Sequence, residues 1–404
     1  MSESFAIYFK PKEVLLTLLH TDDHYSLQSE VKSWDNVQTP DSTTVIDELP
    51  SFLSEGEVFV VDSVNSGKGR ANETNLYSAI VAPLLERLEI NHTYIETTSA
   101  SSITEFAQNF NTPDAKIIFL SGDTSINEFI NGLTLQKKSQ SQSQSAKSIY
   151  LYPIPLGTGN SFALSLDLTS PLQSVSRLLA SKQASPLHLY NLSLPQGSFH
   201  LVQNSAGDVV ESADLKFIVV FSWAFHASLV ADSDTPELRK HGLERFQIAA
   251  RNNLSRTQEY EGDIIITNAK SGGKDVIEGP FAYFLLTPST RFEPTFDISP
   301  KGNIFDTNLY LVAFRTQRNH DSYIMDIMMQ AYDKGKHTEN PDVIYRRINR
   351  DEQVTLLTKN SQELQQRRFC VDGSIIALPN VSSHKIDVQA AGNTVSGYEL
   401  FVIH

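Results

Sequence analysis

A short apolar run followed directly by small and acidic residues stands at residues 117–133, IIFLSGDTSINEFINGL. The run predicts a buried strand, and the apolar residues from Ile126 onward recur at helical spacing. The turn between them therefore lies at a helix N-terminus, where free backbone N–H groups and the helix dipole favour an anion. The candidate phosphate-binding residues are Ser121, Gly122 and Thr124, with the Asp123 carboxylate at the turn and Glu128 one turn into the helix.

A second strand–turn–helix unit repeats this design at residues 153–162, within PIPLGTGNSFALSL. Gly157 and Gly159 let the backbone approach a ligand closely, and Asn160 or Ser161 can cap the following helix. Two such turns in one sheet predict a single bound polyphosphate. This unit adds Gly157, Thr158, Gly159 and Asn160 to the predicted nucleotide site.

A third turn follows the apolar strand at residues 58–61 and precedes a helix at about 75–88. One interpretation is a nucleotide-phosphate loop with Lys68 near the phosphates, and the other is a plain strand–helix turn that needs glycine. Lys68 lacks the rest of the standard phosphate-loop pattern. The candidate binding residues in this turn are Asn65, Ser66, Gly67 and Lys68.

These turns resemble the motifs of the diacylglycerol kinase catalytic-domain family, which includes bacterial lipid kinases, sphingosine kinases and ceramide kinases. SGDTSINEFINGL is similar to GGDGTxNExxNGL, and PLGTGNSFA matches the second family motif almost letter for letter. Residues 63–69 resemble NPxSGxG, with Ser63 and Val64 in place of Asn and Pro. The resemblance implies that Thr97 contacts the nucleotide, although a helix-capping Ser/Thr cluster explains the same residue.

Two structural domains and a short lead must position these motifs. Residues 1–55 form a strand-rich N-terminal lead. Alternating strands and helices in residues 56–185 predict a doubly wound parallel sheet with the glycine turns at the carboxyl ends of its strands. Residues 186–404 hold many short strands and two expected helices, at about 236–254 and 321–333, which predicts an antiparallel β-sandwich. The polar segment 136–147 reads as a flexible surface loop.

The second domain also resembles the family. Residues 221–246, FSWAFHASLVADSDTPELRKHGLERF, are similar to the GFxxDxxxDSE…RxLGxxRF segment of ceramide and sphingosine kinases. The resemblance implies nucleotide-phosphate contacts from Lys240 and Arg245, although a solvated helix face explains both. It also implies lipid contacts from Phe225, Ser228 and Asp232. Because Ser228 replaces the family aspartate, no carboxylate is there to meet a sphingoid ammonium, and a neutral acceptor is favoured.

The closing motif RRFCVDGSIIAL resembles VDGExxxL, with Asp372 present and Ser374 in place of the glutamate. Phosphoryl transfer needs positioned phosphates, a divalent metal and a carboxylate near the acceptor hydroxyl. Asp123 is the predicted base, and an N-capping role is its alternative. Asp372 is the second candidate base or a Mg²⁺ ligand. Thr124, which replaces a family glycine, and Ser374 both argue for weaker activity, and threonine costs about 1–3 kcal/mol if its φ is positive.

Composition excludes several classes of protein. At 404 residues, two domains are the default. Thirty-three Lys and Arg against 47 Asp and Glu give a net charge of −14, which argues against a nucleic-acid partner. The single cysteine, Cys370, excludes an internal disulfide and fits a reduced, cytoplasmic setting. No window approaches a membrane span, so lipid contact must be peripheral, and a homodimer is left open.

The predicted function is an ATP- and Mg²⁺-dependent lipid kinase that acts on diacylglycerol, ceramide or a sphingoid base at a membrane surface. A catalytically weak or inactive relative that binds nucleotide or lipid is the main alternative. A soluble NAD kinase is a weaker one, because that fold shares the GGDGT turn but lacks the PLGTGN partner and the closing motif in this form.

Overall fold

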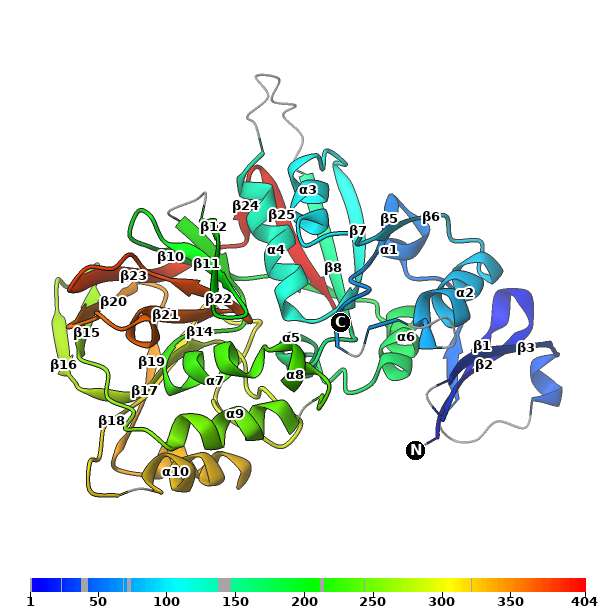
Figure 1. Cartoon of the computed structure of the whole chain (residues 1–404). Coiled ribbons are helices and arrows are strands. Elements are labelled where there is room, and N and C mark those ends of the chain that lie inside the picture. The colour runs from blue at the N-terminus through cyan, green and yellow to red at the C-terminus, as the bar shows by residue number, and fades with distance from the viewer. Residues whose placement is uncertain are drawn as a thin grey trace.

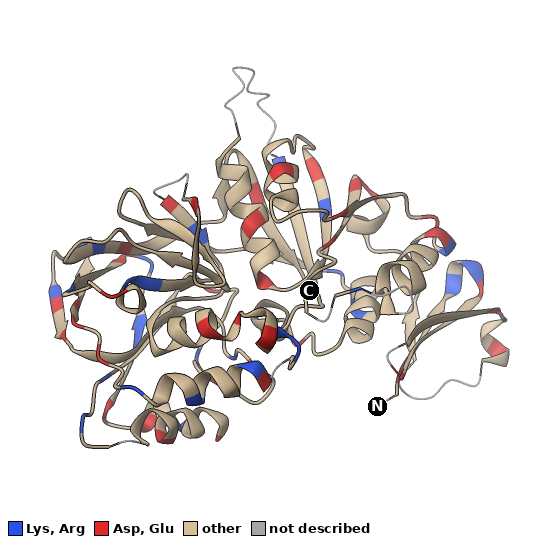
Figure 2. Ribbon diagram, viewed as in Figure 1, with Lys and Arg blue, Asp and Glu red and all other residues tan. Residues whose placement is uncertain are grey.

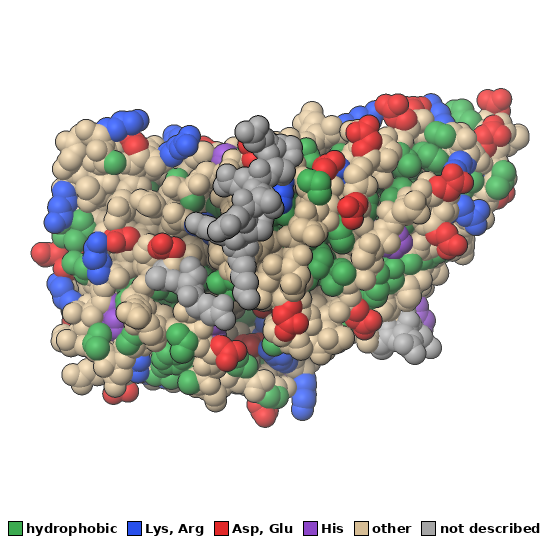
Figure 3. Space-filling view, turned by 90° about the horizontal axis from the view of Figure 1, so that it is seen from above, with side chains coloured by type: hydrophobic (Ala, Val, Ile, Leu, Met, Phe, Trp, Pro, Cys, Tyr) green, Lys and Arg blue, Asp and Glu red, His purple; other side chains and the backbone are tan. Residues whose placement is uncertain are grey.

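The computed structural model describes residues 2–22, 24–37, 43–67, 69–70, 74–136, 147–210, 214–242, 244–320 and 322–404. An α/β domain occupies the middle of the molecule, with a small sheet on one side and a β-rich domain on the other (Figure 1). Seen from above, the molecule is elongated and tapers toward the end that carries the small sheet (Figure 3). The interior of the predicted loop at 136–147 lies outside the described residues.

The α/β domain contains the four parallel strands that the sequence predicts. Strand β5 pairs in parallel with β6 and β7, and β7 pairs in parallel with β8. Their bounds are β5 (Glu57–Asp62), β6 (His92–Glu96), β7 (Asp114–Ser121) and β8 (Lys147–Pro155). Strand β7 is buried on both faces from Ala115 onward, which is why it reads as a continuous apolar run.

Helices cover both faces of this sheet (Figure 1). Helix α4 (Asp123–Thr134) buries Ile126, Phe129, Ile130 and Leu133, the residues whose spacing predicts it. A π-helical turn (Tyr77–Val81) leads into α2 (Ala82–Arg87). The other helices are α1 (Ser51–Ser54), α3 (Ser102–Gln108), α5 (Ser161–Ser165) and α6 (Pro171–Ala180).

The last strand of the chain belongs to the α/β sheet. The sequence places ELFVI in the second domain, but β25 (Tyr398–Ile403) pairs in parallel with β8. Short strands β24 (Thr394–Val395) and β9 (Ala184–Pro186) pair antiparallel with β25. The sequence pattern does not predict that β25 joins this sheet, because pairing between strands more than 200 residues apart has no local sequence signal. The domain boundaries at residues 55 and 185 stay a prediction.

The N-terminal lead forms a four-stranded sheet in the order β3-β2-β1-β4. Its strands are β1 (Glu3–Phe9), β2 (Val14–Thr21), β3 (His24–Val31) and β4 (Thr44–Ile46). Strands β1, β2 and β4 contact helix α6 of the α/β domain. Ile7, Leu16 and Leu18 are buried there, so the lead packs as part of the main core.

The second domain consists of a six-stranded and an eight-stranded sheet that share one hydrophobic core, which confirms the predicted sandwich. The six-stranded sheet has the order β13-β10-β23-β20-β15-β16, and the eight-stranded sheet has the order β12-β11-β22-β21-β14-β17-β18-β19. The bounds are β10 (Leu189–Ser193), β11 (Phe199–Val202), β12 (Ser205–Val209), β13 (Asp214–Phe217), β14 (Phe221–Ala224), β15 (Gly262–Asn268), β16 (Lys274–Glu278), β17 (Phe281–Thr287), β18 (Leu309–Arg315), β19 (Val343–Ile348), β20 (Glu352–Lys359), β21 (Arg368–Val371), β22 (Ser374–Ala377) and β23 (Ser383–Gly392).

Helices gather on one side of the sandwich (Figure 1). The predicted helix at 236–254 is two helices, α8 (Pro236–Arg239) and α9 (Glu244–Leu254), and the one at 321–333 is α10 (Tyr323–Tyr332). Helix α7 (Phe225–Ser233) was not predicted, because the apolar run before it reads as one continuous strand. Acidic and basic residues are both spread over the two domains (Figure 2). No helix within the described ranges has the length and apolar character needed to cross a membrane.

Candidate active site

Three glycine turns pack against one another at the carboxyl ends of the adjacent strands β5, β7 and β8. A Cβ atom on Gly157 would lie 2.5 Å from the Gly122 Cα atom and 2.9 Å from its nitrogen. A Cβ atom on Gly67, whose φ is +62°, would overlap the Leu156 carbonyl oxygen. Each turn therefore needs glycine for close backbone packing, and the three turns form one surface. Gly159, in contrast, faces open space, with nothing within 4 Å of a Cβ atom built on it.

Asp123 joins the Gly122 turn to the Gly157 turn. Its carboxylate accepts hydrogen bonds from the Ser161 backbone N–H (2.8 Å) and the Phe162 backbone N–H (3.1 Å), at the first residues of α5. Burial raises the pKa of Asp123 to about 7, and the nearby Asp372 carboxylate adds to the shift, while the two N–H donors oppose it. The side chain is thus poised near neutral pH, where a general base works best.

The structure corrects the expected cap of helix α5. Asn160 or Ser161 was expected to cap this helix, but the Asn160 side chain at the N-cap makes no capping hydrogen bond. Its amide instead accepts from Gly157 N–H (2.9 Å) and donates to Gly157 C=O (3.0 Å), which closes the glycine turn. Asp123, from another helix, takes over the capping role, a contact that sequence spacing cannot reveal.

The turn after β5, which contains Gly67, is stabilised by residues that were not predicted as site residues. Arg70 forms a buried ion pair with Asp62 (3.1 Å) and donates to the Leu120 carbonyl at the end of β7 (3.1 Å). Tyr94 donates to the other Asp62 oxygen (3.2 Å). The Thr97 hydroxyl accepts from the Val64 N–H (3.1 Å), so Thr97 braces this turn. Lys68 lies outside the described residues; Asn65 is exposed, and the Ser66 hydroxyl donates to Ser63 (2.8 Å).

Thr124 carries no backbone strain, contrary to the cost considered from sequence. It lies in the first turn of α4 and is not among the described residues with positive φ. Its hydroxyl donates to the Asp372 carbonyl (3.0 Å), and it fills the space where a Cβ on Gly373 would otherwise stand. The replacement of glycine by threonine therefore adds a contact between the two domains.

Asp372 is 1% exposed and its carboxylate is fully engaged. It accepts from three consecutive backbone N–H groups, those of Ile218, Val219 and Val220, at 2.7–2.8 Å. The fourth donor is the Asn127 side chain, at 2.8 Å. Burial raises the pKa of Asp372 to about 6, and the backbone donors oppose this rise. Since a carboxylate has about four acceptor positions, none is left for a substrate or a metal.

Asn127 and Asn131 add further hydrogen bonds between α4 and the second domain. Neither was predicted as a site residue. The Asn131 amide donates to the Lys216 carbonyl (3.0 Å) and accepts from the Lys216 N–H (2.8 Å), as a neighbouring strand would. Asn127 also donates to the Lys216 carbonyl (2.8 Å). The NEFING letters of SGDTSINEFINGL contain both asparagines, so that motif was the available signal.

Comparison with known proteins identifies the α/β domain. Residues 58–192 match the family model described as the diacylglycerol kinase catalytic domain. The α/β domain is therefore similar to a diacylglycerol kinase catalytic domain. No curated protein matches the chain at a significant level.

The fold around the kinase domain is also found among solved structures. A crystal structure of a diacylglycerol kinase from Bacillus anthracis str. Sterne is 14% identical, with a TM-score of 0.51. A second structure from that organism, provisionally named a diacylglycerol kinase, is 14% identical, with a TM-score of 0.58. Both comparisons cover 86% of this chain and 97% of the other. At this identity the likeness concerns the fold, an α/β domain followed by a β-rich domain, which confirms the predicted fold class.

Asp372 does not fit the predicted role of Mg²⁺ ligand. Asp372 was the predicted Mg²⁺ ligand, but its four acceptor positions are taken by N–H donors. Among the residues that the structure describes, no three His, Cys, Asp or Glu side chains are grouped to hold a metal ion. Mg²⁺ therefore stays a prediction from the family resemblance, and Asp372 acts as a structural carboxylate.

The three residues of the second domain that were predicted to contact lipid all contact other parts of the protein. Ser228 is fully buried and shares a hydrogen bond with the Tyr260 hydroxyl (2.9 Å). Asp232 pairs with Arg368 (2.6 Å) and Arg256 (3.0 Å), so its carboxylate ties α7 to β21. Phe225 is buried in the core. None of these three side chains is presented to a ligand in this arrangement.

The two predicted cations differ from each other. Lys240 is exposed at the end of α8. The Arg245 guanidinium is largely buried, its nearest carboxylate is that of Asp234 at 3.5 Å, and its Nε has no partner among the described residues. Burial lowers the pKa of Arg245, which remains a cation. Arg245 therefore keeps donors for an anion, whereas Lys240 is also explained as a solvated surface residue.

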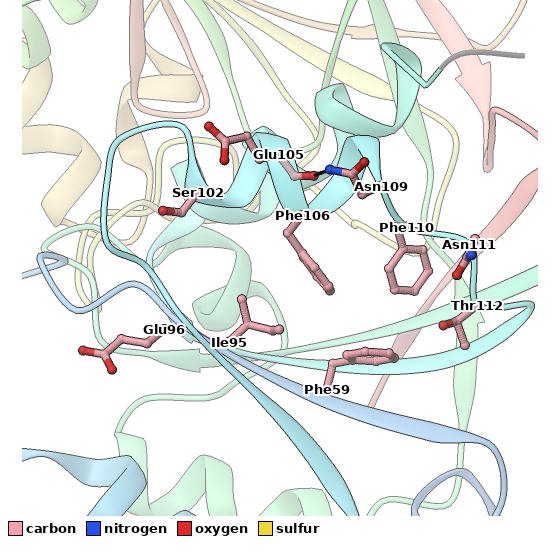
Figure 4. Close-up of a pocket in the computed structure, with 10 residues that line it drawn as sticks. All are labelled: Phe59, Ile95, Glu96, Ser102, Glu105, Phe106, Asn109, Phe110, Asn111 and Thr112. Carbon is pink, nitrogen blue, oxygen red and sulfur yellow. Dashed lines mark hydrogen bonds between the residues drawn. The ribbon is translucent and has the colours of Figure 1, made fainter.

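A hollow of the α/β domain lies away from the glycine turns (Figure 4). It has a volume of about 400 Å³ and lies between β5, β6 and α3. Phe59, Phe106 and Phe110 point toward one another across it, and Glu96 and Glu105 lie near one end (Figure 4). None of the predicted nucleotide or lipid residues lines this hollow.

Glu128, on α4, is half-buried, and burial raises its pKa to about 7.

Proposed function

We propose that this protein is an ATP-dependent lipid kinase that transfers the γ-phosphate to a lipid hydroxyl at a membrane surface. The observation that supports this most directly is the mutual packing of the Gly67, Gly122 and Gly157 turns. Three glycine turns on one surface let backbone approach a polyphosphate closely, and the N-terminus of α4 offers it backbone N–H groups. Gly159 faces the open side of that surface, where a phosphate would approach.

Asp123 is the residue that we assign as the base for the acceptor hydroxyl. Each of its oxygens accepts one backbone N–H and keeps a further lone pair. Its pKa of about 7 allows it to take up the proton that the acceptor loses near neutral pH. The donors from α5 also fix its orientation, which favours transfer by positioning.

The acceptor that we favour is neutral, namely diacylglycerol or ceramide rather than a sphingoid base. The position that would carry a headgroup carboxylate holds Ser228, and Ser228 is itself buried against Tyr260. An ammonium group needs an anionic partner to leave water. A hydroxyl, ester or amide needs only neutral donors and acceptors.

Incubation with Mg-ATP and mixed micelles tests the proposal. Diacylglycerol, ceramide and sphingosine are supplied separately, and transfer of labelled phosphate to each lipid is measured. We expect transfer to diacylglycerol or ceramide and little to sphingosine. The absence of transfer to every lipid of the panel contradicts the kinase assignment.

A kinase-like protein that binds nucleotide or lipid without transfer is the second candidate. The observation that favours it is the use of both candidate carboxylates as structural acceptors, Asp123 at α5 and Asp372 at residues 218–220. This candidate predicts that ATP raises the melting temperature of the protein while no lipid in the panel is labelled.

A further inference from the structure

His226 occupies the first turn of α7, at the junction with β14. Its Nδ1 shares a hydrogen bond of 2.6 Å with the Ser222 hydroxyl, and no described residue hydrogen-bonds to its Nε2. Burial lowers the pKa of His226 to about 4, so the imidazole is neutral at physiological pH. The ring is half-buried and packs 5.4 Å from the ring of Phe292. The Nε2 atom of the neutral imidazole is therefore left to hydrogen-bond another molecule.

Tyr283, on β17, lies beside His226. It pairs across the sheet with Ala224, two residues before His226, and the His226 and Tyr283 rings are 6.1 Å apart in an edge-on arrangement. Tyr283 is 1% exposed, and its hydroxyl has no hydrogen-bond partner among the described residues. Because leaving a buried hydroxyl unpaired costs free energy, such a group calls for an explanation.

The strand that pairs with β14 leads from this pair to the predicted active site. Ser222, which holds His226, pairs across the sheet with Cys370 on β21. Two residues further along, the Asp372 backbone carbonyl accepts a hydrogen bond from the hydroxyl of Thr124, next to the candidate base. The His226–Tyr283 pair thus lies in the part of the second domain that is joined directly to the phosphate turns.

We propose that the Tyr283 hydroxyl and the His226 imidazole form the recognition site for the neutral polar group of the acceptor lipid, its ester or amide carbonyl or a hydroxyl. This inference rests on the proposed function. Tyr283 donates to the lipid oxygen, and His226 Nε2 supplies the second hydrogen bond. The aromatic rings of Phe292 and Phe314 beside the pair provide apolar contact for the attached chains.

The chemistry of the pair selects against a charged acceptor. Burial raises the pKa of the Tyr283 phenol, so it stays a neutral donor. Neither residue carries a charge that would balance an ammonium group. The site therefore takes diacylglycerol or ceramide in preference to a sphingoid base.

The variant Tyr283→Phe tests this site, with short-chain dioctanoylglycerol in mixed micelles as the probe. We expect the KM for dioctanoylglycerol to rise roughly fivefold to tenfold, because one neutral hydrogen bond is lost. The KM for ATP should stay unchanged. The melting temperature should stay the same or rise, since the variant removes a hydroxyl that is unpaired in the free protein.

Ser289→Ala is the matched control. Ser289 is also fully buried with an unpaired hydroxyl, but it lies beyond the end of β17. Its loss should leave the KM for dioctanoylglycerol unchanged. If Tyr283→Phe and Ser289→Ala give the same lipid KM as the native protein, the recognition site is refuted while the kinase assignment stands.

Direct binding separates failure of this site from failure of the proposed function. Dioctanoylglycerol is titrated into the native protein and into Tyr283→Phe without ATP, and the heat of binding is measured. Weaker binding by the variant supports the site even if no phosphate is transferred, which would refute only the kinase assignment. Equal binding by both proteins, or no binding by the native protein, overturns the site.

Discussion

Gly157 packs against Gly122 so closely that a Cβ atom on Gly157 would stand 2.5 Å from the Gly122 Cα atom. The two residues follow adjacent parallel strands whose last paired residues are Ser121 and Pro155. Sheet register therefore brings the two turns side by side, and glycine lets their backbones touch. The predicted polyphosphate site depends on this contact.

Gly157→Ala should destabilise the protein by about 1–3 kcal/mol, because the new methyl group overlaps backbone that cannot rotate away. The free energy of unfolding is measured by denaturant titration. Gly159→Ala is the control, since its methyl group meets nothing within 4 Å. We expect Gly159→Ala to keep its stability but to weaken ATP binding, because the methyl group occupies the space of the phosphates. Equal stability of the two variants would show that the turns are not packed as described.

Asp123→Asn should lower the rate of phosphoryl transfer by about 100-fold or more, because the amide cannot accept a proton from the lipid hydroxyl. The native enzyme should show kcat/KM rising with pH through about 7, the pKa of Asp123. The residual activity of the variant should lack this rise. A variant that matches the native rate contradicts the base assignment.

The raised pKa of Asp123 also predicts how stability depends on pH. Between about pH 4 and 7 the folded protein keeps this carboxyl protonated while the unfolded chain ionises it, since the ordinary value is 3.8. Stability from this group is present at low pH and is lost as pH rises to about 7. Asp123→Asn should flatten that decline when melting temperatures are compared at pH 4.5 and 7.5.

Asp372→Asn should destabilise the protein by about 2–3 kcal/mol, because the amide nitrogen would face backbone N–H donors that need an acceptor. The substitution should add no backbone strain, since φ is +46° at this residue and asparagine tolerates that region. Thermal unfolding measures the loss. A variant of native stability that instead needs more Mg²⁺ would restore Asp372 as a metal ligand.

Ala224→Gly should stabilise the protein by about 1 kcal/mol. Ala224 precedes α7 with φ +62° and ψ −135°, a conformation that essentially only glycine adopts without strain. Relief of about 1–3 kcal/mol of strain outweighs the extra chain entropy of glycine. Denaturant titration measures the gain, and a destabilised variant would show that the alanine methyl contributes more by packing than it costs in strain.

Much of the α/β domain was predictable because short stretches of sequence indicate its strands and helices. The apolar runs before each glycine turn predict buried parallel strands, and the spacing from Ile126 to Leu133 predicts α4. Helix α7 was not predictable, because Phe225 continues an apolar run that starts in β14. There the tertiary packing of Phe225 and Ser228 decides for helix over strand.

The sequence alone determined which residues can carry the chemistry: the order of the three glycine turns and the carboxylate at Asp123. It determined this because turn glycines and strand ends are local properties of a chain. Only the tertiary structure decided the surroundings of each carboxylate, since burial and hydrogen-bond donors come from distant segments. Asp123 receives its donors from α5 and Asp372 receives its donors from residues 218–220 and from Asn127, so their pKa values and roles follow from contacts that span up to 245 residues of chain.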